Sequence, residues 1–376
     1  MQGHSAYTST VLPAWVNAEG PADDVVLSTR ARLARNIEGI PFPSKARAAD
    51  LRRVADAISD AVYECGGRFG KLRVIRPGHL SESDRLALVD ARVASREHVS
   101  GGSYRPVVLN DNGTLSLMVN EEDHLRIQYI LPGFQPMTAL QMVREFDSFL
   151  GKKIRYARAD NYGYLTASLA NVGTGLRLSV LLHLGGLGIL GEVTSALTAA
   201  AELRISVRGL LGEGTGAYGD LYQVSNETTI GLSDREIASR VRAAAEHLVA
   251  RERDARRILA CTRREDLISA VHTARERLME ARELSGRAAM ACLSVLRLGS
   301  ELGIVSDFSL KDFNELLISM QLAISASDER GKMGSLSDDI KRAKLIRARL
   351  GKKGETRQLA FPENGEPDRQ PERHSK

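Results

Sequence analysis

The hydrophobic pattern of this chain changes its period once, near Ser233, and that change limits the architectures the chain can adopt. Before Ser233, short apolar runs, alternating polar positions and glycine-containing turns predict strands mixed with a few helices. After Ser233, apolar residues recur only at helical spacing. The later helices are predicted at 234–259, 264–284, 286–302, 310–324 and 338–350. The fold class is therefore α/β (α+β), with an all-α C-terminal domain.

The length of 376 residues favours two domains, because single hydrophobic cores stop growing near 250 to 300 residues. We expect a short N-terminal arm at 1–20, which carries Trp15, and a catalytic domain at 21–235. A helical domain at 236–350 follows, and its probable role is dimerisation. Residues 351–376 are rich in charge and proline and poor in apolar side chains, so we expect a disordered tail.

Composition excludes several classes of protein. The apolar stretch at 176–203 is interrupted by His183, Glu192 and glycines, so it should not span a bilayer. The three cysteines are too scattered for a disulfide framework or a zinc site. The net charge is +5, but no basic run is interleaved with aromatic residues, which argues against direct nucleic-acid binding. With no recognisable leader, we expect a cytoplasmic protein without membrane contact.

Five arginines in short, polar, glycine-rich segments form the candidate functional constellation. They are Arg30, Arg32, Arg126, Arg177 and Arg208. An isolated arginine is usually a solvated surface charge, but arginine also binds phosphate oxygens bidentately while keeping its own charge. Several arginines that converge on one pocket could bind a nucleoside triphosphate without a P-loop. Two glutamates, Glu122 and Glu213, lie close in sequence to these arginines and could orient the group that receives the phosphate.

Local patterns support this interpretation. Arg30 and Arg32 occupy alternate positions of an extended segment, so both should point to one side. Arg126 follows Glu122 by four residues, after a predicted hairpin, which places a cation and an anion at one end of a sheet. Arg177 follows a glycine–threonine turn whose backbone N–H groups could also bind phosphate. Arg208 precedes a loop with five glycines, as a mobile lid would require.

Four segments, in order, resemble the motifs of the phosphagen (guanidino) kinases: 28–36, 120–127, 171–177 and 207–215. Within that superfamily the chain is most similar to the bacterial protein arginine kinases, because it lacks the helical N-terminal domain of creatine and arginine kinases and has a helical C-terminal domain. The resemblance implies a catalytic domain with an antiparallel sheet flanked by helices. It also implies ATP-dependent phosphorylation of protein arginine side chains by in-line transfer.

The resemblance carries specific roles onto this sequence. The nucleotide-binding positions that it implies are Ser28, Thr29, Arg30, Ala31, Arg32, His98 as the adenine-site histidine, Arg126, Arg177, Leu178, Ser179, Val180, Leu181, Arg208, Gly209, Leu210, Leu211, Gly212 and Glu213. The implied cofactors are ATP and Mg²⁺. We expect the metal ion to be held mainly by phosphate oxygens and water, with no metal-ligating residues in the protein.

The acceptor side of the site departs from the family pattern at one position. Glu122 matches the catalytic base and Glu213 the second carboxylate that orients the guanidinium. Ser168 replaces a reactive cysteine, and a serine hydroxyl cannot supply the negative charge of a thiolate. We expect the replacement to slow the reaction without abolishing it, at a cost of about 1 to 3 kcal/mol.

A second departure lies in the helical domain. Protein arginine kinases carry an RDxxRA motif that resembles a phosphoarginine-sensing site, and here the segment at 338–343 begins with Asp338 in place of arginine. A possible allosteric site retains Asp339, Arg342 and Ala343. Alternatively, these acidic residues simply complement the dipole at a helix N-terminus.

The resemblance also implies partners: arginine-bearing protein substrates, a zinc-finger activator similar to McsA, a Clp protease system and a second copy of the chain in a homodimer. It implies a role in protein quality control and the stress response. Two alternatives remain open, a kinase for free arginine and a weakly active or inactive regulatory homologue. The missing N-terminal specificity domain argues against the first, and the retention of five arginines and two glutamates against the second.

Overall fold

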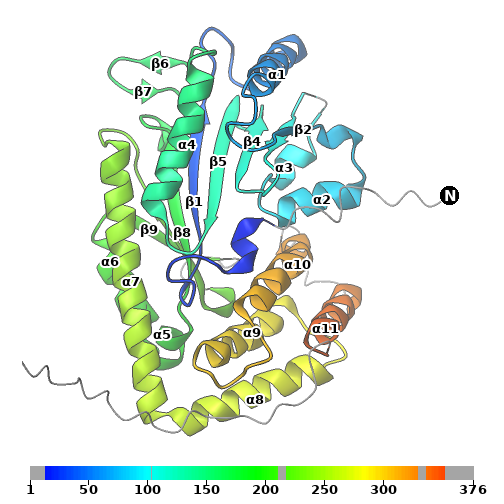
Figure 1. The fold of residues 1–376 in the computed structure, drawn as a ribbon, viewed down its shortest axis with the longest axis vertical. Coiled ribbons are helices and arrows are strands. Elements are labelled where there is room, and N and C mark those ends of the chain that lie inside the picture. Colours follow the sequence, from blue (N-terminus) through cyan, green and yellow to red (C-terminus); the bar gives the residue numbers. More distant parts are fainter. Residues whose placement is uncertain (1–12, 103, 211–216, 329–335, 352–376) are drawn as a thin grey trace, which may run out of the picture.

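An eight-stranded antiparallel sheet forms the centre of the molecule (Figure 1). The computed structural model describes residues 13–102, 104–210, 217–328 and 336–351. The strand order is β2-β3-β4-β5-β1-β8-β10-β9. The strands are β1 (Val26–Arg35), β2 (Arg73–Ile75), β3 (Val107–Leu109), β4 (Leu115–Val119), β5 (Leu125–Pro132), β8 (Leu176–His183), β9 (Ile205–Gly209) and β10 (Leu221–Asn226), and a separate hairpin joins β6 (Arg158–Ala159) to β7 (Gly163–Tyr164).

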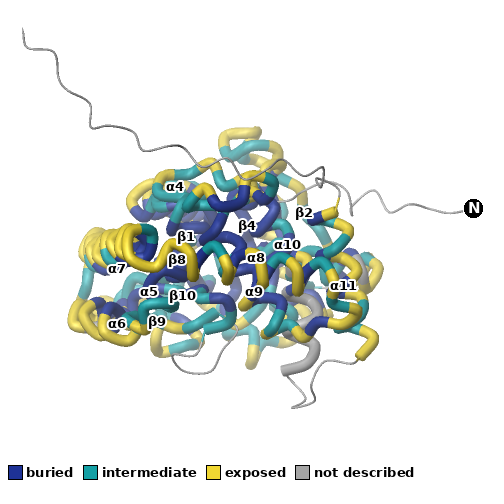
Figure 2. The backbone as a smooth tube through the Cα atoms, turned by 90° about the horizontal axis from the view of Figure 1, so that it is seen from below, coloured by how far each residue is buried: buried dark blue, intermediate teal, exposed yellow. Residues whose placement is uncertain are grey.

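One face of the sheet is apolar and forms the main core. Since side chains alternate along a strand and paired residues share a face, the register places Leu33, Ile127 and Leu176 together on this side. Five helices pack with this part of the chain: α1 (Ala48–Tyr63), α4 (Pro136–Gly151), α5 (Gly185–Leu190), α6 (Val193–Ala201) and α7 (Asp234–Thr262). Figure 2 shows the central strands as the most buried layer, with the outer surfaces of α6 and α7 exposed.

The other face of the sheet is polar and is only partly covered by other elements. The short helices α2 (Glu82–Asp90) and α3 (Arg96–Val99) pack over β3 and β4 through a small apolar cluster. The 3-10 turn η1 (Ala14–Asn17) lies against a group of four helices, of which α10 also contacts α2. The group consists of α8 (Arg264–Glu280), α9 (Gly286–Glu301), α10 (Leu310–Asp328) and α11 (Leu336–Gly351). Figure 1 shows this helical group gathered at one end of the sheet.

Helix α7 packs mainly with the sheet. Its buried residues, among them Ile237, Val241 and Leu248, belong to the main core, whereas Leu267 of α8 belongs to the second core, which the helical group shares with a few strand residues. The change from strands to helices near Ser233 therefore does not coincide with a change of core, and the domain boundary that we expected at residue 235 stays a prediction. Periodicity cannot reveal which core a helix joins, because that choice depends on distant contacts.

Other elements agree with the sequence patterns, with small shifts. The predicted hairpin is β3 and β4. Helix α1 begins at Ala48, where Asp50 closes a capping box with Arg47. Trp15 of the N-terminal arm is fully buried against Ile130 and Ile318. The expected tail, except Gly351, lies outside the described residues.

A buried ion pair locks the end of β1 to α4. The Arg35 guanidinium donates from Nε and Nη2 to the Asp147 carboxylate at 3.0 and 2.8 Å, and from Nη1 to the carbonyls of Ala34 and Thr174. Its Cζ lies 3.6 Å from the centre of the Tyr164 ring. Arg35 thus fixes the turn that leads into β8, although it sits in the same motif as the candidate phosphate-binding arginines. Across the part of the chain that the structure describes, no helix has the length and apolar character needed to cross a membrane.

Candidate active site

The strand register gathers four of the five candidate arginines on the polar face of the sheet. Arg32 of β1 pairs with Gln128 of β5 and with Arg177 of β8, and these three side chains share a face. Arg30 lies two residues earlier on β1. Arg126 lies two residues before Gln128 on β5. This arrangement is consistent with the prediction that Arg30 and Arg32, at alternate positions of β1, point to one side.

Arg208 extends the same face across two further strands. It pairs with Gln223 of β10, which in turn pairs with Leu181 of β8. Five strands therefore contribute to one polar surface. Its members are Ser28, Arg30, Arg32, Arg126, Gln128, Arg177, Ser179, Ser206, Arg208, Gln223 and Ser225.

The cations on this face raise one another's electrostatic energy. Burial and the charges of Arg92, Arg126 and Arg177 lower the pKa of Arg30 to about 9. Burial and the neighbouring arginines lower the pKa of Arg32 well below its ordinary value. Arginine nevertheless keeps its proton at neutral pH, so the cost appears as unfavourable free energy. A polyanion bound here would remove that cost.

Several buried nitrogens at this face have no hydrogen-bond partner among the residues that the structure describes. They are Nε of Arg32, Nε of Arg177 and Nη2 of Arg92. An unsatisfied buried donor costs about 1 to 3 kcal/mol, and more when it is charged. The donors are therefore positioned to bind a ligand with many oxygen acceptors, as phosphate groups have.

Glu121 is the acidic residue that pairs with a cation of this face. Its carboxylate forms an ion pair with Arg126 and accepts a hydrogen bond from the Ser95 hydroxyl. Burial acts to raise the pKa of Glu121, but Arg126 and Ser95 hold it below its ordinary value. Glu121 therefore links Arg126 of β5 to Ser95 at the start of α3.

Glu122 lies at the same end of the face and is exposed. Its neighbour Asp123 is buried and accepts hydrogen bonds from Asn36 Nδ2 at 2.6 Å and from the Ala167 backbone N–H at 2.7 Å. Burial raises the pKa of Asp123, and the charge of Glu122 contributes in the same direction. Asp123 therefore connects the turn that carries Glu122 to the segment that carries Ser168.

Ser168 lies one residue after Ala167, which contacts Asp123, and its place on the acceptor side stays a prediction. It is half-buried, and its carbonyl accepts hydrogen bonds from the Thr166 hydroxyl and from the backbone N–H of Asn171. Its own hydroxyl does not cap the 3-10 turn η3 (Leu169–Asn171) that follows. Glu122 and Ser168 thus flank one short hydrogen-bonded connection.

The nucleotide-binding positions that the resemblance implies along each strand are divided between the two faces of the sheet. Thr29 is buried and donates to the Gly133 carbonyl at 2.7 Å, and Ala31, Leu178 and Val180 lie in the core. These four support the strands that carry the arginines. On β9, Arg208 is followed by Gly209, and Leu210 hydrogen bonds to Leu221 at the base of the loop. The implied residues Leu211, Gly212 and Glu213 lie outside the described residues.

His98 does not join the arginine face. It is fully buried, its Nε2 lies 3.3 Å from the Pro106 carbonyl oxygen, and burial lowers the pKa of its imidazole to about 4. Arg92, in contrast, lines a small cavity with Arg30, Ser179 and Gln223. The role of His98 at the adenine stays a prediction without a contact to support it.

Sequence analysis missed Arg92, because nothing in its local pattern separates it from a surface arginine. It follows the end of α2 and adopts a positive φ of 59°, which is uncommon for a long side chain. Its carbonyl accepts a hydrogen bond from Gln128 at 2.7 Å, and its guanidinium lies 5.5 Å from the centre of the Trp15 ring. The buried N-terminal arm and the sheet together direct this cation toward Arg30.

The implied phosphoarginine-sensing residues make internal contacts. Arg342 is buried and donates at 2.6 Å both to the Leu284 carbonyl and to Asp339. Ala343 is fully buried in the helical core. Arg342 and Asp339 therefore join α11 to the segment between α8 and α9, and a sensing role for them stays a prediction.

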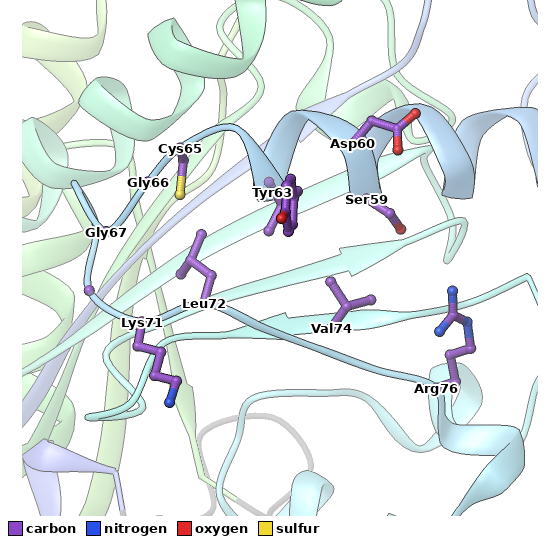
Figure 3. Close-up of a pocket in the computed structure, with 12 residues that line it drawn as sticks. Ser59, Asp60, Tyr63, Cys65, Gly66, Gly67, Lys71, Leu72, Val74 and Arg76 are labelled. Atoms are coloured by element: carbon purple, nitrogen blue, oxygen red, sulfur yellow. The ribbon is translucent and has the colours of Figure 1, made fainter.

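A larger hollow of about 620 Å³ lies on the other face of the sheet, between α1 and the edge strand β2 (Figure 3). Leu72 and Val74 of the β2 segment line it opposite Tyr63 of α1. The register that joins Val74 to Val108 and then to Leu117 places it on the apolar side. It is therefore separate from the arginine face.

Comparison with known proteins agrees with the geometry. Residues 53–255 match the model of the ATP:guanido phosphotransferase C-terminal catalytic domain. Residues 264–360 match the protein-arginine kinase McsB C-terminal domain. Lombricine kinase superposes on 63% of this chain and 68% of its own, with a TM-score of 0.56 and 23% identity. The substrate-free duplicated taurocyamine kinase from Schistosoma mansoni gives a TM-score of 0.53 over 62% of this chain and 35% of its own, with 26% identity.

Relatives that match nearly the whole chain narrow the class of protein to which it belongs. A protein-arginine kinase of Halothermothrix orenii is 36% identical over 336 residues, which is 89% of this chain and 96% of the relative. One from Pelotomaculum thermopropionicum is 40% identical over 335 residues, which is 89% of this chain and 94% of the relative. The fold and the two matched domains define a guanidino phosphotransferase. The chain belongs to the protein-arginine kinase family.

Arg92 should contribute directly to nucleotide affinity. We expect Arg92→Met to raise the Kd for ATP at least about tenfold, because a hydrogen bond to a charged group contributes about 1.5 to 3 kcal/mol. Isothermal titration calorimetry measures this Kd. The matched control is Arg53→Met, which removes an arginine side chain that is 70% exposed on α1. Unchanged affinity of the Arg92 variant would show that the cavity beside Arg30 does not receive the nucleotide.

Proposed function

We propose that this chain transfers the γ-phosphoryl group of ATP to arginine side chains of proteins by direct in-line displacement. The single observation that carries the proposal is the arginine face, which ends at the exposed Glu122. The names of the full-length relatives support proteins as the acceptor. Phosphoryl transfer requires mainly positioning and neutralisation of charge, and a face of fixed cations supplies both.

The nucleotide would lie along β1. Arg30, Arg92 and Ser179 surround the end nearest the helical group, where the nucleoside would bind. Arg32 and Arg177 lie side by side in the middle and would bind the phosphates. Arg126, near the start of β5, would neutralise the γ-phosphoryl oxygens. Its ion-pair partner Glu121 keeps the Arg126 side chain in one orientation.

The acceptor guanidinium requires a base, because its pKa exceeds 12 and its lone pair is delocalised. Glu122 would bind one terminal nitrogen and remove its proton as that nitrogen attacks phosphorus. The N–P bond forms while the bond from phosphorus to the bridging oxygen of ADP breaks, and the proton passes to the Glu122 carboxylate. Glu213 would hold the guanidinium from the other side, which would align the attacking nitrogen with the leaving oxygen.

The metal requirement follows from the same residues. Among the described residues, no group of three or more His, Cys, Asp or Glu side chains could hold a metal ion. We propose that a Mg²⁺ ion accompanies ATP and is held mainly by phosphate oxygens and water, with the arginines fixing the phosphates around it. The ion would supply additional neutralisation of the transferring group.

The setting of the reaction is proposed from the resemblance alone. We infer a cytoplasmic homodimer that marks proteins for a Clp protease, with an McsA-like activator. The helical group α8 to α11 would provide the contact between copies. The possible phosphoarginine site at Asp339 and Arg342 would then need to open the two contacts that Arg342 makes at 2.6 Å.

Intact-mass measurement tests the proposed reaction. An unfolded arginine-rich protein incubated with the enzyme and Mg·ATP should gain the mass of one or more phosphoryl groups, and acid should remove them, because N–P bonds are acid-labile. Glu122→Gln should lower the rate about 10²- to 10⁴-fold, the usual contribution of a general base. Exposed Glu246→Gln is the matched control. Transfer to free arginine but not to protein, or full activity of Glu122→Gln, would refute the proposal.

Ser168 gives a second, independent test. Restoring the thiolate with Ser168→Cys should raise turnover of a protein substrate, because a negative charge beside the acceptor helps to bind and orient its positively charged guanidinium. The expected gain corresponds to about 1 to 3 kcal/mol, or roughly fivefold to 150-fold. Ser168→Ala should leave turnover near that of the unmodified chain. A cysteine variant no faster than the alanine variant would show that this position does not act on the acceptor.

A further inference from the structure

Three large apolar side chains from separate segments stand exposed around one loop beside Glu122. Tyr162 is 57% exposed, Leu169 is 88% exposed and Ile230 is 51% exposed. We call these three residues the acceptor-side patch. Single exposed apolar side chains are ordinary on protein surfaces, but a group of them beside a functional site indicates an interaction surface.

Backbone contacts establish that the patch residues surround the same loop. Gly173 exchanges hydrogen bonds with Tyr164, and a Cβ atom on Gly163 would lie 2.6 Å from the Gly173 carbonyl oxygen. A Cβ atom on Gly173 would lie 2.9 Å from Cα of Ile230. Gly173 is thus enclosed between the segments that carry Tyr162 and Ile230.

Leu169 is held on the same loop by several hydrogen bonds. Thr229 donates from its hydroxyl to the carbonyls of Ala170 and Val172 at 3.1 and 2.6 Å, which ties the turn after Leu169 to the segment before Ile230. The backbone N–H of Val172 also donates to the Leu169 carbonyl at 3.2 Å. Leu169 is therefore presented to solvent by a braced turn.

The patch is continuous with the acceptor end of the site. The Ala167 N–H donates to Asp123 at 2.7 Å. Glu122 directly precedes Asp123, and Leu169 follows Ala167 by two residues, so both lie close to this hydrogen bond along the chain. The β6–β7 hairpin, which includes Gly163, stands at the end of the sheet away from the helical group (Figure 1). A polypeptide that delivers an arginine to Glu122 must therefore lay its neighbouring residues against this loop.

We propose that the acceptor-side patch binds apolar side chains that flank the target arginine of an extended polypeptide. This inference rests on the proposed function and names its substrate class. Apolar residues beside an arginine are accessible in unfolded proteins, whereas a folded protein buries most of them. The patch thus selects unfolded segments by contacts that native surfaces rarely offer. Burying its exposed apolar area against the substrate supplies affinity without any contact to the transferred phosphate.

Binding of two labelled peptides, each with one arginine, tests the inference. One peptide has leucine on both sides of the arginine and the other has serine. Fluorescence anisotropy with ADP present measures each Kd, and kinase assays measure KM and kcat. We expect the unmodified chain to bind the leucine peptide more tightly. Leu169→Ser and Ile230→Ser should each weaken that binding by roughly fivefold and raise KM equally, with kcat and the serine peptide unaffected.

The matched control is Ile258→Ser, on the part of α7 next to the helical group, where Ile258 is 47% exposed. It should bind both peptides like the unmodified chain. Equal weakening of both peptides by Leu169→Ser, no preference for the leucine peptide, or the same loss in the Ile258 variant would overturn the inference. A smaller oligomer for Leu169→Ser in sedimentation would also overturn it, since the patch would then contact a second copy.

Failure of the proposed function would look different. Peptide binding that depends on Leu169, without any phosphoryl transfer, would support the patch and reject the kinase activity. Transfer at equal efficiency to both peptides would support the activity and reject the patch.

Discussion

The structure depends on holding positive charge on one face of a sheet without neutralising it. Arg32 and Arg177 lie side by side, and the buried Nε of each has no hydrogen-bond partner among the described residues. Glu121 forms its ion pair on this face with Arg126. Like charges in a low-dielectric surrounding repel strongly, so the folded chain without ligand carries an unfavourable electrostatic energy. A triphosphate supplies the missing negative charge, so nucleotide binding would remove the unfavourable electrostatic energy that the folded chain carries.

The rest of the molecule provides the rigidity that this arrangement needs. The opposite face of the same strands is packed by five helices, so the arginine-bearing strands cannot separate to relieve repulsion. Arg35 is the contrasting case, because its charge is matched by Asp147 and by the ring of Tyr164. Asn36 and Asp123 then tie the end of β1 to the turn that carries Glu122. Neighbouring residues of one motif thus bind ligand, hold the scaffold or position the acceptor side.

Local sequence patterns predicted much of the fold and of the arginine face. What they did not predict depends on contacts between residues far apart in the sequence. The period of two placed Arg30 and Arg32 on one side, since alternation depends only on neighbouring residues. The register that sets Arg32 beside Arg177 depends on pairing across a long sequence separation, which no local pattern encodes. Arg92 reaches the site through an unusual backbone conformation after a helix, and the motif comparison selected His98, which the fold buries. Helix α7 reads like the helices after it, yet it completes the core of the sheet.

The uncompensated charge is tested most directly by urea unfolding of Arg32→Leu with and without ATP. We predict that the variant without nucleotide is more stable than the unmodified chain, by about 1 to 3 kcal/mol, because a buried unpaired cation is removed. ATP at a hundred times its Kd should stabilise the unmodified chain by about 2.7 kcal/mol and the variant far less. Arg35→Leu, from the same strand, should instead be strongly destabilised, since it leaves Asp147 without its partner. An Arg32→Leu variant that is less stable without ATP, or that ATP stabilises fully, would contradict the account.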